Sequence, residues 1–135
     1  MKFMMIFISL IMVITGCSIR NIDAPPAQEY EIWHNPDANE LEVKKAILEC
    51  GLPDFRNGFE FNEPSHNTIS TFGFCMEKAG FKAQSPASNA CHAFKNENLP
   101  ICQPGAIIPN RSVSKRLNSA YCKKYRSQNL PVCQP

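Results

Sequence analysis

Apolar residues recur at helical spacing in two stretches of the chain and predict two short amphipathic helices. The first stretch places four such residues at i, i+3, i+4 and i+7: Val43, Ala46, Ile47 and Cys50. This spacing puts them on one face of an α-helix. Asn39 is a good N-cap with Glu42 three residues later, and Gly51 and Pro53 favour an end to the helix. We therefore expect a helix over residues 40–50 with a thiol at the end of its buried face.

The second amphipathic stretch begins after a proline. Its apolar stripe is made by Ile69, Phe72, Cys75, Met76 and Ala79. Pro64 is tolerated only in a first turn, so the helix should begin between Asn62 and Ser65 and end at Gly80. Gly73 lowers helix propensity by up to ~1 kcal/mol relative to alanine but permits a close approach of another element.

Each predicted helix carries one cysteine on its apolar face, which suggests a helical hairpin bridged between Cys50 and Cys75. Such a bridge across a 25-residue separation should stabilise the fold by roughly 3 kcal/mol in the chain-entropy model. The carboxylates of the first helix are assigned to its outer, solvated face: Glu40, Glu42 and Glu49. Aromatic residues of the connecting loop are predicted to fold back over the helices: Phe55, Phe59 and Phe61.

An internal repeat occupies the C-terminal part of the chain. The segment 89–104 recurs at 120–135 with an offset of 31 residues and no gaps. Each copy predicts a short helix with the first cysteine, a break at Asn-Leu-Pro, where proline ends the helix, and a return to the second cysteine. We pair Cys91 with Cys102 and Cys122 with Cys133, while bridges between copies, such as Cys91–Cys133, are the alternative. Two copies are too few for a solenoid, so the repeat is a duplicated clip.

A connector at residues 105–109 leads into the second copy, where Ser114 is predicted to cap a helix that runs through Leu117 and Tyr121 to Arg126. The stretch 105–135 contains no acid and six bases: Arg111, Lys115, Arg116, Lys123, Lys124 and Arg126. Residues 17–63 instead hold ten acids and four bases. Positive and negative charges are therefore distributed unequally along the chain, although its formal net charge is only +2.

The N-terminus has the layout of a secretory signal. Lys2 precedes an apolar run from Phe3 to Ile14, interrupted only by Ser9; the run is too short for a permanent membrane helix. The four residues that end it are Ile14, Thr15, Gly16 and Cys17, which resemble the bacterial lipoprotein box position by position. The resemblance implies cleavage before Cys17 and acylation of its thiol and amino group. An ordinary signal peptide with an incidental cysteine is the alternative.

With Cys17 assigned to lipid, six of the seven cysteines remain, and an even set in a short exported chain indicates disulfides. The sequence predicts a mainly α-helical, disulfide-stapled domain. Its expected parts are a signal peptide (1–16), a flexible tether (17–29), the helical hairpin (30–82), a first clip (83–104), and a connector with a second, basic clip (105–135).

No catalytic or metal-binding set stands out, and we expect neither an enzyme nor a cofactor. The chain lacks a Cys-x-x-Cys pair, which disfavours zinc and thiol redox chemistry. Ser65 and His66 are adjacent, a spacing that does not place one side chain on the other, and no Gly-x-Ser-x-Gly elbow is present. The three histidines, His34, His66 and His92, are scattered along the chain and are expected to face solvent or to cap helices.

The six bases of residues 105–135 are the candidate contacts for an anionic partner, such as an envelope component or another envelope protein, and the alternative is a merely solvated surface. Tyr121 and Tyr125 lie at i and i+4 among the bases and are expected to pack rather than to stack on nucleic-acid bases. A chain displayed outside the cytoplasm is not expected to bind nucleic acid.

Residues 30–81 resemble small cysteine-containing lipoproteins of Gram-negative bacteria and their prophages. The resemblance is carried by Trp33-x-x-Pro36, Cys50-Gly51-x-Pro53, Cys75-Met76 and Gly80-Phe81. It brings no catalytic residues with it. The lipoprotein box, the six paired thiols and the absence of a catalytic set lead us to expect a non-enzymatic envelope lipoprotein with a binding or structural role. Ser18 follows Cys17 where aspartate would favour inner-membrane retention in that family, so the outer membrane is favoured. The alternatives are a prophage-encoded factor that masks a receptor against further infection and, with less support, a hydrolase inhibitor.

Overall fold

The computed structural model describes residues 27–56 and 64–135. The chain there is mainly helical and contains no strand, as the periodicity predicts. His34 and Lys82 form one isolated antiparallel bridge between their backbones. No helix within these residues is long and apolar enough to cross a membrane.

The first amphipathic stretch forms helix α3 (Glu40–Glu49), and its prediction is confirmed. The Asn39 side chain accepts a hydrogen bond from the Glu42 N–H at 2.9 Å, which satisfies one free donor of the first turn. All four residues of the predicted stripe are buried. Gly51 follows with φ +109°, a conformation that glycine adopts without strain.

The second stretch forms helix α4 (His66–Lys78), capped by Ser65. Pro64 lies just before the cap, so it stands outside the first turn in which it was predicted. The expected position of Ile69 on the buried face is wrong, because Ile69 is 38 % exposed and Ser70 is buried in its place. The Ser70 hydroxyl donates to the His66 carbonyl at 2.8 Å, so its burial leaves no unpaired polar atom.

The folded part begins earlier than predicted. Glu29 belongs to a short helix, α2 (Glu29–Ile32), although residues 17–29 were assigned to the tether. The backbone N–H of Glu29 donates to the Arg56 carbonyl at 3.1 Å. Trp33 follows α2, packs edge-on against Phe72 at 5.6 Å between ring centroids, and is buried. This packing fixes α2 against α3 and α4.

The three predicted disulfides are confirmed. Cys50–Cys75, Cys91–Cys102 and Cys122–Cys133 are bonded, with Cα–Cα distances of 5.6, 5.6 and 5.4 Å. The bridges therefore lie within each copy of the repeat, and bridges between copies are excluded. Of the loop aromatics, Phe55 is buried as expected, while Phe59 and Phe61 lie outside the described residues.

The two clips have the same backbone. The first contains α5 (Ser88–Ala93), η1 (Lys95–Glu97) and η2 (Pro100–Cys102). The second contains α7 (Ala120–Lys124), η3 (Arg126–Gln128) and η4 (Pro131–Cys133). In both, the asparagine of Asn-Leu-Pro is left-handed, with φ 49° at Asn98 and 50° at Asn129, which reverses the chain direction toward the second cysteine.

The predicted helix from Ser114 to Arg126 is two helices. Ser112, rather than Ser114, caps α6 (Val113–Leu117). The chain then breaks before α7, because the Ser119 side chain accepts from the Cys122 N–H at 3.2 Å and starts a new helix. A side-chain cap of this kind competes with continuation of the preceding helix.

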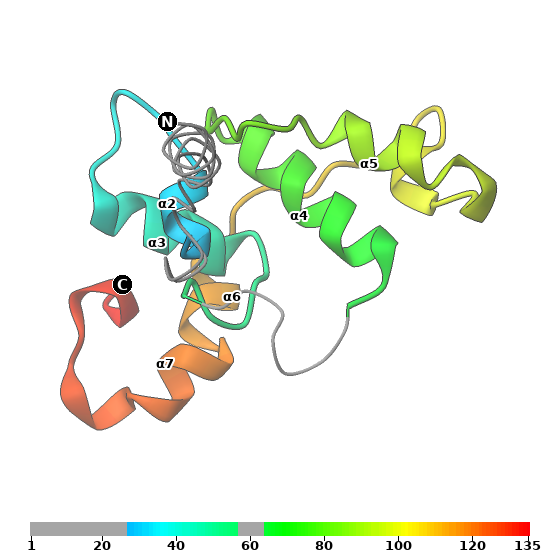
Figure 1. Ribbon diagram of the computed structural model, residues 1–135. Helices are drawn as coiled ribbons and strands as arrows, with labels where there is room; N and C mark the ends of the chain where they lie inside the picture. The colour runs from blue at the N-terminus through cyan, green and yellow to red at the C-terminus, as the bar shows by residue number, and fades with distance from the viewer. Residues whose placement is uncertain (1–26, 57–63) are drawn as a thin grey trace, which may run out of the picture.

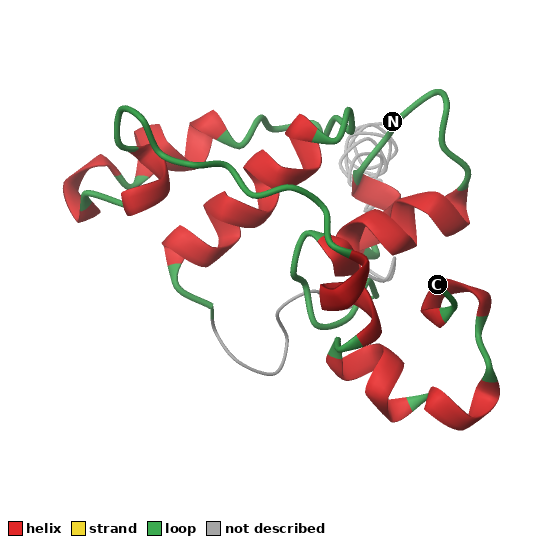
Figure 2. Cartoon of the chain, turned by 180° about the vertical axis from the view of Figure 1, so that it is seen from behind, coloured by secondary structure: helices red, strands yellow, loops and turns green. Residues whose placement is uncertain are grey.

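Helix α3 lies beside α2 and above α6 in the view of Figure 1. It contacts α2, α4, α6 and η4, while α4 contacts α5 and η2. The two clips lie at opposite ends of the molecule, the first beside α4 and the second beside α3 (Figure 2). Each clip therefore packs on a different helix of the disulfide-bridged pair.

Candidate interaction surface

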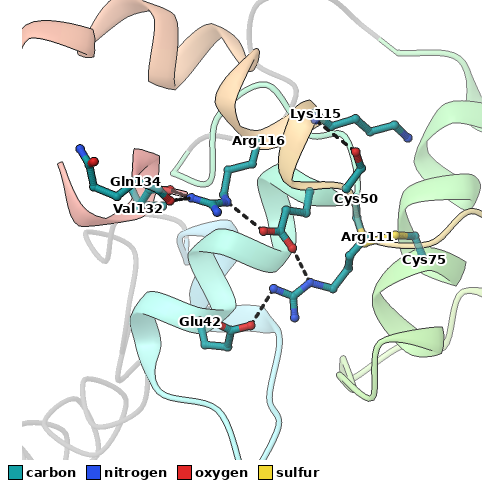
Figure 3. A network of polar contacts seen from close by, with 10 residues as sticks. Glu42, Cys50, Cys75, Arg111, Lys115, Arg116, Val132 and Gln134 are labelled. Atoms are coloured by element: carbon teal, nitrogen blue, oxygen red, sulfur yellow. Dashed lines mark hydrogen bonds and ion pairs between the residues drawn. A yellow bond between two sulfur atoms is a disulfide. The ribbon is translucent and has the colours of Figure 1, made fainter. Parts of the chain in front are cut away.

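Two of the six bases proposed as partner contacts are used inside the protein (Figure 3). Glu49 is 5 % exposed and Arg116 is 2 % exposed. The Glu49 carboxylate accepts from Arg116 Nε at 2.8 Å and from Arg111 Nε at 2.7 Å. The assignment of Glu49 to a solvated face is wrong, and so is that of Arg116 to an external anion, because α6 packs directly on this side of α3.

The same network closes the second clip onto the core. Arg116 Nη1 donates to the Val132 carbonyl at 2.6 Å and also to the Gln134 carbonyl. Arg111 Nη2 donates to Glu42 at 2.6 Å. Burial works to lower the pKa of Arg111, but its bonds to Glu42 and Glu49 outweigh this effect, and the pKa is raised. Arg111 and Arg116 therefore both join the C-terminal part of the chain to α3.

A cluster of aromatic rings and cations covers the surface where α2, α3 and the second clip meet. Phe55 and Tyr121 pack at 4.5 Å between centroids, and Tyr121 packs on Tyr125 at 4.8 Å. The guanidinium of Arg56 lies 5.0 Å from the Tyr121 ring and 5.6 Å from the Tyr125 ring. These distances fit cation–π contacts. We call this group, with Tyr30 and Lys44, the aromatic-cation cluster.

Tyr30 and Lys44 extend the aromatic-cation cluster toward the N-terminal side. The Lys44 ammonium lies 4.2 Å from the Tyr30 ring centroid, and Tyr30 packs edge-on against Phe55 at 6.0 Å. The predicted packing role of Tyr121 and Tyr125 is therefore confirmed. Their rings are only half-buried, so they also form part of the protein surface.

Charge within the cluster is largely compensated. Arg56 binds Asp54 through two bonds, at 3.1 Å from Nε and 2.8 Å from Nη2. Burial opposes ionisation of Asp54, but the Arg56 contact prevails and holds the pKa of this carboxyl below its usual value. A hydrogen bond with Arg56 lowers the pKa of the Tyr125 hydroxyl. Lys44 pairs with Glu40.

Four of the six bases remain exposed: Lys115, Lys123, Lys124 and Arg126. Lys124 borders the aromatic-cation cluster, with Nζ 5.4 Å from the Tyr125 ring centroid. In the described part of the chain, none of these four side chains forms an ion pair with an acid. The second clip thus presents cations beside aromatic rings, an arrangement suited to an anionic partner.

The histidines and Ser65 have structural positions. Ser65 caps α4. His66 stacks on Phe94 at 3.6 Å, and its Nδ1 lies 2.7 Å from a Glu97 oxygen, which ties α4 to the first clip. His34 and His92 are exposed, as predicted. Within residues 27–56 and 64–135, no three His, Cys, Asp or Glu side chains gather as metal ligands would.

An apolar groove lies between α4 and α5, and the exposed Ile69 contributes to it with Ala87, Ala90 and Ala93. Next to this groove, Ala87 of the segment before α5 packs against Gly73 of α4. No cluster of charged groups converges there.

Comparison of the chain with protein-family models, with curated proteins and with solved structures finds no match. The fold and the surface define the class, which is a small disulfide-stapled helical domain with an aromatic and basic face. Sequence reasoning missed Arg56 and Lys44 as members of this face, because they lie far along the chain from the second clip. The nearby Asp54 is the only local signal for Arg56.

Proposed function

We propose that the protein is a lipid-anchored, non-enzymatic component of the bacterial envelope that acts by binding or by structural contact. The anchor is Cys17, and the outer membrane is its favoured location. The observation that carries the proposal is the pairing of all six remaining cysteines. This pairing leaves Cys17 as the one cysteine of the sequence available for another modification.

Three disulfides in so short a chain support an oxidising compartment such as the periplasm or cell surface. The lipoprotein box at residues 14–17 accounts for export to that compartment and for a seventh, unpaired cysteine. Export as a soluble protein would leave a free thiol at Cys17. Lipid attachment at Cys17 therefore explains the seventh cysteine better than export as a soluble protein does.

A binding role is supported by how the polar side chains are used. Ser65 caps α4, His66 connects α4 to the first clip, and Glu49 is the buried partner of Arg116. Lys115, Lys123, Lys124 and Arg126 are instead exposed and form no ion pair with an acid in the described part of the chain, and all four lie within residues 105–135. Clustered cations favour recognition of an anionic surface or partner.

The anchor is tested by expression of the full chain and of Cys17→Ser in a Gram-negative host with labelled palmitate. We expect label in the wild-type chain and none in the variant, and the wild-type chain should be found in the membrane with an intact mass that fits cleavage before residue 17. The variant should keep its three disulfides. An unlabelled wild-type protein, or a soluble cytosolic one with reduced thiols, would overturn the proposal.

A further inference from the structure

Because the clip occurs twice in the chain, a comparison of the two copies shows which residues the clip fold needs. Both clips have the same helical segments, the same left-handed asparagine and the same disulfide separation of 11 residues. At the positions of Lys123 and Lys124, the first clip has His92 and Ala93. The clip fold therefore does not need the two lysines, which leaves their charge to be explained by something outside the clip.

The second clip also lies beside the point where the chain enters the fold. The N–H of Glu29 binds the Arg56 carbonyl, and the N–H of Tyr30 binds the Phe55 carbonyl at 3.3 Å. Arg56 in turn contacts the Tyr125 ring, which Lys124 also approaches. The twelve residues from Cys17 to Gln28 span at most about 43 Å. A lipid on Cys17 thus keeps this face near a bilayer.

We infer that the exposed side of the second clip, which carries Lys123, Lys124 and Arg126 and on which Lys124 lies beside the half-buried Tyr125, docks on a bilayer of anionic phospholipid. Ammonium and guanidinium groups would meet the headgroup phosphates, and the Tyr125 ring matches the boundary between polar headgroups and acyl chains. This inference rests on the proposed lipid anchor, which would hold the face at high local concentration over the membrane.

Of the acids close to this face, Asp54 and Glu40 have their charge offset by a cation. Glu29 and Glu31 accept only from neutral donors and keep their negative charge, but the three exposed cations Lys123, Lys124 and Arg126 outnumber them. The first clip lies at the opposite end of the molecule (Figure 1), so it remains free when the second is docked.

The test uses the full chain with Cys17→Ser, so that acylation at this position does not contribute. Co-sedimentation compares vesicles of phosphatidylglycerol mixed with phosphatidylcholine against vesicles of phosphatidylcholine alone. We expect tighter binding to the anionic vesicles, and screening of that preference by salt. In this background, Lys123→His/Lys124→Ala should reduce anionic binding roughly 25-fold, at about fivefold per cation.

The matched control is Lys82→Ala/Lys95→Ala, which removes the same number of exposed lysines elsewhere. It should change anionic binding by less than about threefold if the docked face is the second clip. Equal losses in both variants would overturn the assigned face, and equal binding to both vesicle types would overturn docking altogether. Far-ultraviolet circular dichroism confirms folding of each variant. Since palmitate labelling is measured separately, failure of docking and failure of the anchor are distinguishable.

Discussion

At the scale of single residues, the structure depends on one buried carboxylate. Glu49 is the acid partner of a guanidinium that is 2 % exposed. Arg116 also donates to two backbone carbonyls near the C-terminus. Removing one member of a buried ion pair leaves an uncompensated charge in a poorly solvated place, so the two residues stabilise the fold only together.

Glu49→Gln should therefore lower the free energy of unfolding by about 3–5 kcal/mol. The matched control is Glu42→Gln, because the Glu42 side chain is 43 % exposed and pairs only with Arg111. That change should cost less than about 1 kcal/mol. Urea unfolding at neutral pH with disulfides intact measures both values. If both variants lose a similar free energy of unfolding, the buried pair contributes no more to stability than the exposed pair.

At the scale of helices, close approach decides which faces are buried. A Cβ atom added at Gly73 would lie 2.9 Å from the Ala87 Cβ atom. The segment before α5 therefore packs directly on α4, as the glycine in the sequence suggested. This approach links the first clip to the hairpin in addition to the His66–Glu97 contact.

Gly73→Ala tests whether packing outweighs helix propensity. Propensity alone would raise stability by up to ~1 kcal/mol, whereas overpacking costs about 1–3 kcal/mol. We expect a net loss in thermal unfolding, because the contact is shorter than Cβ atoms normally allow. Adding Ala87→Gly should relieve the overpacking. If Gly73→Ala alone is more stable than the wild-type protein, the segment before α5 shifts without a loss of stability.

At the scale of the whole molecule, the clips differ in how they join the core. Cys122 and Val132 of the second clip belong to the main buried cluster, and Arg116 ties its end to α3. Leu99 of the first clip is buried at 6 % exposure but lies outside that cluster. The two clips have similar local structures but pack differently against the core, so the free energy of local opening should differ between them.

Native-state hydrogen exchange should show this difference at equivalent amides. Glu97 and Cys102 of the first clip correspond to Gln128 and Cys133 of the second, and all four N–H groups donate to carbonyls within their clip at 2.8–3.0 Å. We expect the first pair to exchange at least roughly tenfold faster through local opening. Equal protection would mean that both clips open only with global unfolding.

Much of the fold was predictable, because its determinants are local. Asn39 and Gly51 mark the ends of α3 by capping and left-handed geometry, and the apolar period identifies its buried face. The duplicated Asn-Leu-Pro brings each second cysteine back to the first within one copy. Local capping also explains the failure at Ser119, where a second serine starts a new helix.

The sequence was sufficient to predict helices α3 and α4, the two clips and the three disulfide pairs, since these depend on local capping, on apolar periodicity or on a repeated spacing; α2 and the break between α6 and α7 were not predicted. Only the tertiary structure decided which charges are buried. Arg116 and Glu49 are 67 residues apart, and nothing local distinguishes them from the solvated charges around them. Their burial follows from α6 lying across α3, and that packing divides the basic residues into internal ties and an exposed face.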